Sequence, residues 1–199
     1  MNETAVDKIF RALMERIVTG DLPAGEKLRQ DHIARDYEVS HVPVREAFLR
    51  LEAKGLAKSV PHKGMRVTAL EPTEIREVIE MRVALEVLAL THALPRHDAE
   101  TLARAEEARL ACDAATDMVT WDRCNRRFHF ALLAPCTMPR LLAAIEDLHL
   151  TAARHMFAFW QDRWVPRPDG DHAALIAATQ AQDLPLACDL LRRHLRRVS

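Results

Sequence analysis

The chain has 199 residues, of which 49% are hydrophobic, 29% charged and 5% aromatic. This balance excludes a disordered chain, and the small number of glycines argues against a sandwich or barrel with many tight turns. The formal net charge of -1 excludes a polycation as a whole, yet residues 27–66 hold nine Lys and Arg against five Asp and Glu, a local excess of the kind that binds nucleic acid.

The first 70 residues predict three helices and a hairpin. Apolar residues recur at helical spacing over 5–18, and shorter helices are predicted over 29–37 and from Ser40, a good N-cap, to Gly55. Two extended segments, 56–60 and 65–70, then flank a tip that contains Pro and Gly, which predicts a two-stranded hairpin.

The remaining residues predict helices only. Six amphipathic segments are separated by prolines and a Pro- and Gly-containing stretch, and the change of texture places a domain boundary near 70–72. We therefore expect a mainly α protein with domains 1–71 and 72–199, the second a bundle of about six helices. The expected helices span 73–94, 98–116, 119–134, 138–161, 171–182 and 184–197.

Three helices followed by a hairpin form the layout of a winged helix-turn-helix. In this fold the start of the third helix enters the major groove of double-stranded DNA. Arg45 is suited to a guanine edge or a phosphate, and Lys63 and Arg66 on the hairpin to phosphates or the minor groove. The residues predicted at the start of the third helix are Ser40, His41, Val42, Pro43 and Arg45.

The sequence of this region resembles the DNA-binding domain of the GntR family of bacterial transcription regulators. The resemblance covers 5–70 and implies an operator-binding role for the third helix and for Lys63 and Gly64 of the hairpin tip. His41 replaces the usual Arg of the family, and Glu38 stands in a turn where Gly is common. A helix-turn-helix kept as a dimerisation or scaffold module is the alternative. The matching segments are 22–28, 33–34, 39–52, 55–56 and 61–67.

The second domain offers a set of metal-ligand residues. Asn125 and His129 are one helical turn apart and share a face with Leu132 and Leu133, so both are predicted to point inward. With His172 and His194 they would give three imidazoles and one oxygen, a set suited to zinc or nickel with one open position. The chain has ten histidines, and spacing alone leaves structural roles open for each.

These residues also resemble the FCD effector-binding domain of the FadR branch of GntR regulators. The resemblance implies a divalent metal held by Asn125, His129, His172 and His194, beside which a small carboxylate effector binds. It also implies that Arg82 and Asn125 contact that effector. An ion pair between Arg82 and Glu86, four residues apart, is the simpler interpretation of Arg82. The matching segments are 125–132, 139–142, 171–178 and 183–195.

Together these features predict a bacterial transcription regulator, most simply a repressor released by an organic acid, that binds operator DNA as a homodimer and is not an enzyme. The absence of a signal-like N-terminus and of long apolar segments predicts a cytoplasmic protein with no membrane partner. The alternatives are a metal-dependent hydrolase or lyase, for which no general base is evident, and a DNA-binding protein whose metal is structural.

Overall fold

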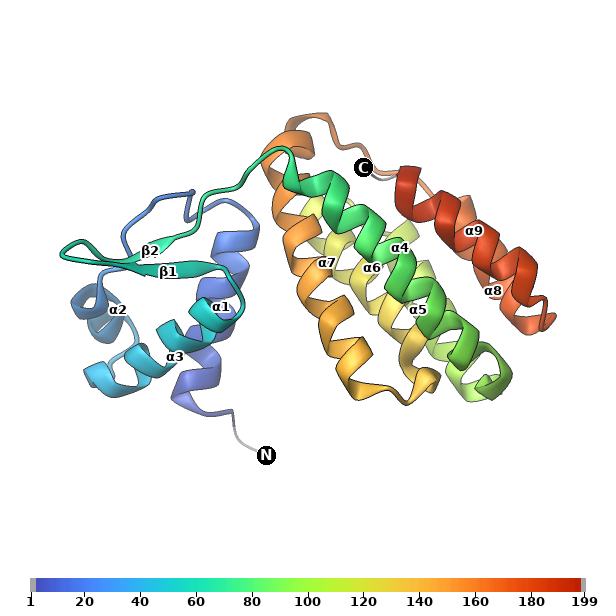
Figure 1. Cartoon of the computed structure of the whole chain (residues 1–199), viewed down its shortest axis with the longest axis horizontal. Helices are drawn as coiled ribbons and strands as arrows, with labels where there is room; N and C mark the ends of the chain where they lie inside the picture. The colour runs from blue at the N-terminus through green and yellow to red at the C-terminus, as the bar shows by residue number, and fades with distance from the viewer. Residues whose placement is uncertain (1–2, 198–199) are drawn as a thin grey trace. The chain divides into compact units, whose positions relative to one another are not determined.

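The computed structural model describes residues 3–197, which form two compact units divided between Pro72 and Thr73 (Figure 1). We call them the N-terminal unit and the C-terminal unit. Nine α-helices and two strands are present in the described part of the chain. None of its helices is long and apolar enough to cross a membrane.

The N-terminal unit contains three helices and an antiparallel hairpin. The helices are α1 (Ala5–Val18), α2 (Gln30–Asp36) and α3 (His41–Ala53), and the strands are β1 (Ala57–Val60) and β2 (Gly64–Val67). Ala57 pairs with Val67 and Val60 with Gly64, and a bridge between Lys27 and Arg66 adds a short third chain segment.

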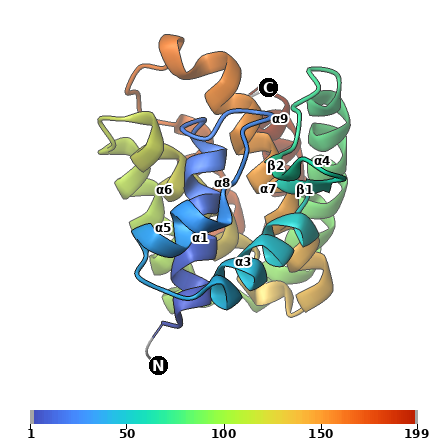
Figure 2. The same ribbon diagram turned by 90° about the vertical axis from the view of Figure 1, so that its left-hand side faces the viewer.

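The core of this unit follows from helical periodicity. Ile9, Leu13 and Ile17 lie one turn apart on α1 and are buried against α3, whose apolar face is also buried. Thr4 begins α1 with a capping box, in which its hydroxyl accepts a hydrogen bond from the backbone N–H of Asp7. Figure 2 shows α3 below the hairpin and α1 to its left.

The C-terminal unit is a bundle of six helices. Asp98 and Asp117 cap the second and third helices of the unit with side-chain hydrogen bonds, and short 3-10 turns that contain Pro95 and Pro135 close the helices before them. The helices are α4 (Glu74–Ala93), α5 (Ala99–Asp113), α6 (Met118–Leu133), α7 (Pro139–Trp160), α8 (Gly170–Gln180) and α9 (Leu184–Arg197).

Helix α4 holds this bundle together, because it contacts α6, α7 and α9. Helices α8 and α9 pack side by side (Figure 1), as do α5 and α6. This packing brings polar side chains of α4, α6, α7, α8 and α9 into the interior of one unit. The predicted fold class, three helices and a hairpin followed by about six helices, is confirmed, with ends that differ by at most three residues.

The turn between α2 and α3 contains Glu38 in the left-handed region, with φ +54°. Its N–H donates to the carbonyl of Arg35, and the next N–H, of Val39, donates to Ala34. These bonds end α2 in the way that a glycine usually does. Glu38 therefore holds a strained backbone conformation at a position where glycine is common.

We expect Glu38→Gly to raise the free energy of unfolding of the N-terminal unit by about 1 kcal/mol, because glycine adopts this conformation without steric cost. Calorimetry of the full chain would measure the shift in melting temperature. Glu15→Gly, at an exposed position inside α1, is the matched control and should lower it instead. A lower melting temperature for Glu38→Gly would contradict the strain.

Candidate nucleic-acid interface and metal centre

The start of α3 is exposed and polar. Ser40 occupies the N-cap position, but its hydroxyl makes no capping hydrogen bond, so the hydroxyl and the first N–H groups of the helix face solvent. Val42 is 63% exposed and Arg45 is exposed, whereas Pro43 is partly buried. The arrangement suits a phosphate and a base edge.

Two neighbouring contacts fix the first residue of this helix. The carbonyl of His41 accepts a hydrogen bond of 3.2 Å from the Gln30 side chain, and the His41 ring lies 3.4 Å from a carboxylate oxygen of Asp31. Both partners belong to α2. His41 therefore contacts α2 through both its backbone and its ring, contacts that the sequence did not reveal.

A groove of about 500 Å³ joins α3 to the hairpin. It is lined by Arg45 and Leu49 of α3, by Ser59 and Gly64 of the hairpin, and by Lys27. Lys63 lies exposed at the hairpin tip. The structure thus brings two of the predicted DNA-binding residues, Arg45 and Gly64, to one groove of the N-terminal unit.

Two arginines near this groove have structural partners. Arg66 donates a hydrogen bond of 2.8 Å to the carbonyl of Gly25, and Arg50 pairs with Asp7 at 2.6 Å, which ties α3 to α1. Arg66 therefore anchors the hairpin. The sequence predicted only that it contacts phosphates or the minor groove.

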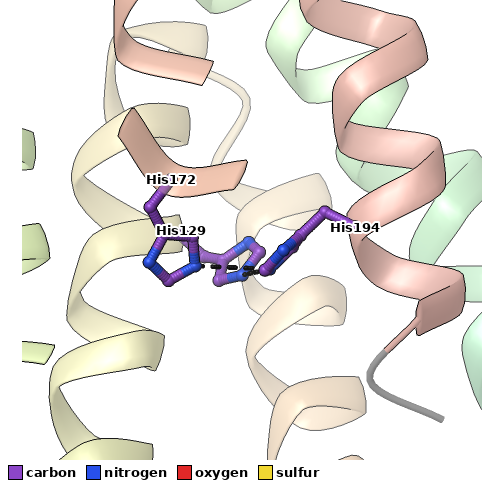
Figure 3. Close-up of side chains that lie close together, drawn as sticks. All are labelled: His129, His172 and His194. Carbon is purple, nitrogen blue, oxygen red and sulfur yellow. Dashed lines mark hydrogen bonds between the residues drawn. The ribbon is translucent and has the colours of Figure 1, made fainter. Parts of the chain in front are cut away.

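Three histidines converge inside the C-terminal unit (Figure 3). His129 comes from α6, His172 from α8 and His194 from α9, and all three are buried. The Nε2 atom of His194 lies 3.3 Å from the Nε2 atoms of both His129 and His172. The predicted metal-ligand histidines are therefore brought together, with the same ring nitrogen of each turned to one point.

No placement of protons gives a good hydrogen bond to every nitrogen–nitrogen contact of this cluster. The Nδ1 atom of His129 lies 2.8 Å from the Glu86 carboxylate and must donate to it, which leaves Nε2 with a lone pair. A single proton on Nε2 of His194 can then satisfy only one of its two imidazole contacts well. In a tetrahedral zinc site with bonds of about 2.05 Å the nitrogens lie about 3.3 Å apart, so the cluster fits a divalent metal.

Asn125 lies one turn before His129 on α6 and is buried, with no hydrogen-bond partner for its Oδ1 among the described residues. A buried carbonyl oxygen without a partner costs about 1–3 kcal/mol. A metal or an effector would relieve that cost. Its neighbour Asp122 is occupied, because it pairs with Arg126 at 2.9 Å.

Glu86 of α4 forms a buried network beside the cluster. It is fully buried and lies 2.8 Å from the Nε atom of Arg82 and 3.1 Å from Nε2 of His149. Burial is the largest single influence and opposes the charged form, but the Arg82 guanidinium, His149 and His129 together outweigh it and hold the pKa of Glu86 well below its usual range. Burial also lowers the pKa of His129, so this ring is neutral near pH 7.

Arg82 forms the ion pair with Glu86 that the spacing suggested, and the pair is internal to the bundle. Arg82 is 9% exposed, and its Nε and Nη2 atoms serve Glu86 and His149. Its Nη1 atom makes no hydrogen bond to the described residues and is the part of the side chain left for a ligand. Sequence reasoning missed His149, because only the fold shows that α7 faces α4.

Two further carboxylates face the cluster from α8 and the residue before it. Asp169 and Asp171 lie 3.7 Å and 3.6 Å from Nδ1 of His194, and Arg197 bridges both carboxylates at 3.1 Å and 3.2 Å. Burial lowers the pKa of His194 to about 4. At 3.6–3.7 Å neither carboxylate accepts a hydrogen bond from Nδ1 of His194. Both nevertheless lie beside the outer nitrogen, where carboxylates support metal-bound histidines, and the sequence signals them as Asp-x-Asp-His.

A winged helix-turn-helix with an exposed recognition helix, followed by a helical bundle with a buried polar centre, defines a transcription regulator. The family model for bacterial regulatory proteins of the gntR family matches residues 5–67, and that for the FCD domain matches 77–197. The chain therefore belongs to the GntR family and carries an FCD domain. This class consists of regulators, which confirms the prediction that the protein is not an enzyme.

Relatives and solved structures agree with this assignment. The chain is 32% identical to the HTH-type transcriptional repressor GlaR of Escherichia coli, over 98% of this chain and 94% of that one. A GntR family member from Pseudomonas syringae is 31% identical with a TM-score of 0.59, covering 97% of this chain and 82% of that chain. McbR/YncC of E. coli shares the fold, with a TM-score of 0.86 at 23% identity over 98% and 95% of the two chains.

We expect Glu86→Gln to lower the free energy of unfolding by about 3 kcal/mol, because it leaves the Arg82 guanidinium buried without a counter-charge. Chemical denaturation of the full chain would measure the loss. Glu80→Gln is the matched control, because Glu80 lies on the same helix as Glu86 and forms an exposed pair with Arg196 of α9. This substitution should have a much smaller effect. Equal effects of the two substitutions would contradict the role assigned to Glu86.

Proposed function

We propose that this protein is a cytoplasmic repressor that binds operator DNA as a homodimer and responds to a small organic acid held beside a divalent metal. The observation that carries the proposal is the convergence of three buried imidazole nitrogens within a chain whose other unit exposes a recognition helix. The name of the GlaR relative, a repressor, supports the direction of regulation. The homodimer is supported by the use of two-fold symmetry in reading palindromic DNA.

His129, His172, His194 and Asn125 would hold the metal, zinc or nickel by the chemistry of these donors. When bound, the metal supplies a positive charge and an open position for an anionic ligand. The chain's own residues do the remaining work: Glu86 keeps the proton of His129 on Nδ1, and Nη1 of Arg82 donates to the effector carboxylate.

Binding of the acid would favour one packing of the helical bundle over another, and so change the spacing of the two recognition helices in the dimer. A ligand shifts such an equilibrium only by its differential affinity for the two states. In this proposal the contacts of His172 and His194 differ between the two states. These residues lie on the neighbouring helices α8 and α9, which can shift together relative to α6.

We expect Arg45→Ala to weaken specific operator binding by about 1–3 kcal/mol, roughly fivefold to 150-fold, because it removes a contact to a base edge or phosphate. An operator selected from random duplexes would provide the probe for a mobility-shift titration. Arg16→Ala, an exposed arginine of α1, is the control and should bind as the natural chain does. Unchanged affinity of Arg45→Ala would contradict the assignment of α3.

We expect chelator-treated protein to bind one zinc or nickel ion per chain and to melt at a higher temperature when it does. At a metal concentration a thousand times the dissociation constant, the free energy of unfolding should rise by about 4 kcal/mol. Elemental analysis would give the stoichiometry and thermal unfolding the stabilisation. His172→Gln should abolish both, whereas His32→Gln, exposed on α2, should not.

The same thermal assay separates the proposed sensor from a structural metal. A small carboxylate should add stability to the metal-loaded protein and lose that effect after chelation or in Arg82→Gln. If the metal stabilises the protein and no carboxylate adds to it, the metal is structural and the proposed effector site beside it is wrong.

A further inference from the structure

All three tryptophans of the chain line one cavity in the C-terminal unit. The cavity measures about 210 Å³ and is bounded by Trp121 of α6, Trp160 at the end of α7 and Trp164 beyond it. The rings of Trp121 and Trp164 are 6.3 Å apart and inclined by 52°. Engineered apolar cavities of about 150 Å³ already admit benzene, so the space accommodates an aromatic ring.

The exposure of these apolar groups is unusual for a helical bundle. Trp160 is 49% exposed and Val165, which also lines the cavity, is 63% exposed. Large exposed apolar groups gathered around a hollow indicate a ligand site more often than a free surface.

The charged groups of the wall have an excess of guanidinium. Arg163 and Arg167 line the cavity, are exposed and form no ion pair within residues 3–197. The third arginine of the wall, Arg197, is committed to Asp169 and Asp171. Because Arg193 also pairs with Asp171 at 3.5 Å, these two carboxylates are balanced by two arginines, which leaves Arg163 and Arg167 for an anion.

We propose that this cavity binds an aromatic carboxylate, whose ring packs among the tryptophans and whose carboxylate pairs with Arg163 and Arg167. The inference adds to the proposed function, on which its regulatory consequence rests, a second acid-binding site apart from the metal and names the chemical class of its ligand. It assigns that class to residues other than Arg82 and Asn125, the effector contacts implied by the family resemblance.

The cavity borders the histidine cluster through one residue. The second carboxylate oxygen of Asp169 lies 3.8 Å from Nε2 of His172 and 3.7 Å from Nδ1 of His194. A ligand anion that competes for Arg197 changes the charge felt by both rings. A ligand in the cavity is therefore connected to the histidine cluster by two successive contacts, from Arg197 to Asp169 and from Asp169 to the imidazoles.

Tryptophan fluorescence tests the binding directly, because every tryptophan of the chain lies in this cavity. The full chain would be titrated with 3-phenylpropanoate and excited at the red edge of indole absorption, where this probe does not absorb. We expect a saturable change in emission, with affinity at least about tenfold weaker for the neutral 3-phenylpropanamide and for acetate.

Variants that keep all three fluorophores locate the anion. The double variant Arg163→Gln, Arg167→Gln should weaken 3-phenylpropanoate about tenfold or more, and Arg140→Gln, an exposed arginine of α7 outside the cavity, should not change it. Linear, unsaturable emission changes, equal affinity for acid and amide, or an unaffected double variant would each overturn the proposal.

Two further arms separate this inference from the proposed function. Binding should persist in chelator, because Arg163 and Arg167 do not contact the imidazoles; its loss would show that a metal holds the carboxylate and would overturn the assignment. If 3-phenylpropanoate binds saturably but the affinity for the selected operator does not change, the cavity is a binding site. In that case this ligand does not control operator binding.

Discussion

The chemistry of the C-terminal unit depends on one buried carboxylate. Glu86 has no exposed surface, and an isolated charge there would cost several kcal/mol. Arg82 on its own helix, His129 on α6 and His149 on α7 together offset that cost, so three helices are held at fixed distances from one point. The same contacts fix the proton of His129 on Nδ1 and turn the lone pair of Nε2 toward His194.

The two sides of the histidine cluster are held with different strength. On the α6 side, Nδ1 of His129 makes a hydrogen bond of 2.8 Å to Glu86. On the α8 and α9 side, Nδ1 of His194 lies 3.6–3.7 Å from the carboxylates of Asp171 and Asp169, beyond hydrogen-bond length, and Nδ1 of His172 has no hydrogen-bond partner within the described chain. His129 on α6 is therefore the more firmly held ring, and the rings of His172 on α8 and His194 on α9 are the less restrained members of the cluster.

The sequence predicted much of this because its signals are local. Helical periodicity and prolines placed every helix within a few residues, and the four-residue spacing of Asn125 and His129 placed them on one face of α6. The burial of the Arg82–Glu86 pair was not predictable in this way, since the same spacing is common on helix surfaces. His149 and the three tryptophans are brought into place only by contacts between distant segments, which no periodicity encodes.

Asp169 shows why the cavity and the cluster behave as one electrostatic unit. Its Oδ1 caps α8 by accepting the N–H of Asp171 and also receives Arg197, while its Oδ2 faces His172 and His194. One carboxylate therefore fixes the start of the helix that carries His172 and, through Arg197, the end of the helix that carries His194. Because its oxygens are shared in this way, a change in the partner of Arg197 on the cavity side alters the field at both imidazoles without any movement of α6. Coupling of this kind needs only the less restrained pair, α8 and α9, to have two arrangements of similar energy.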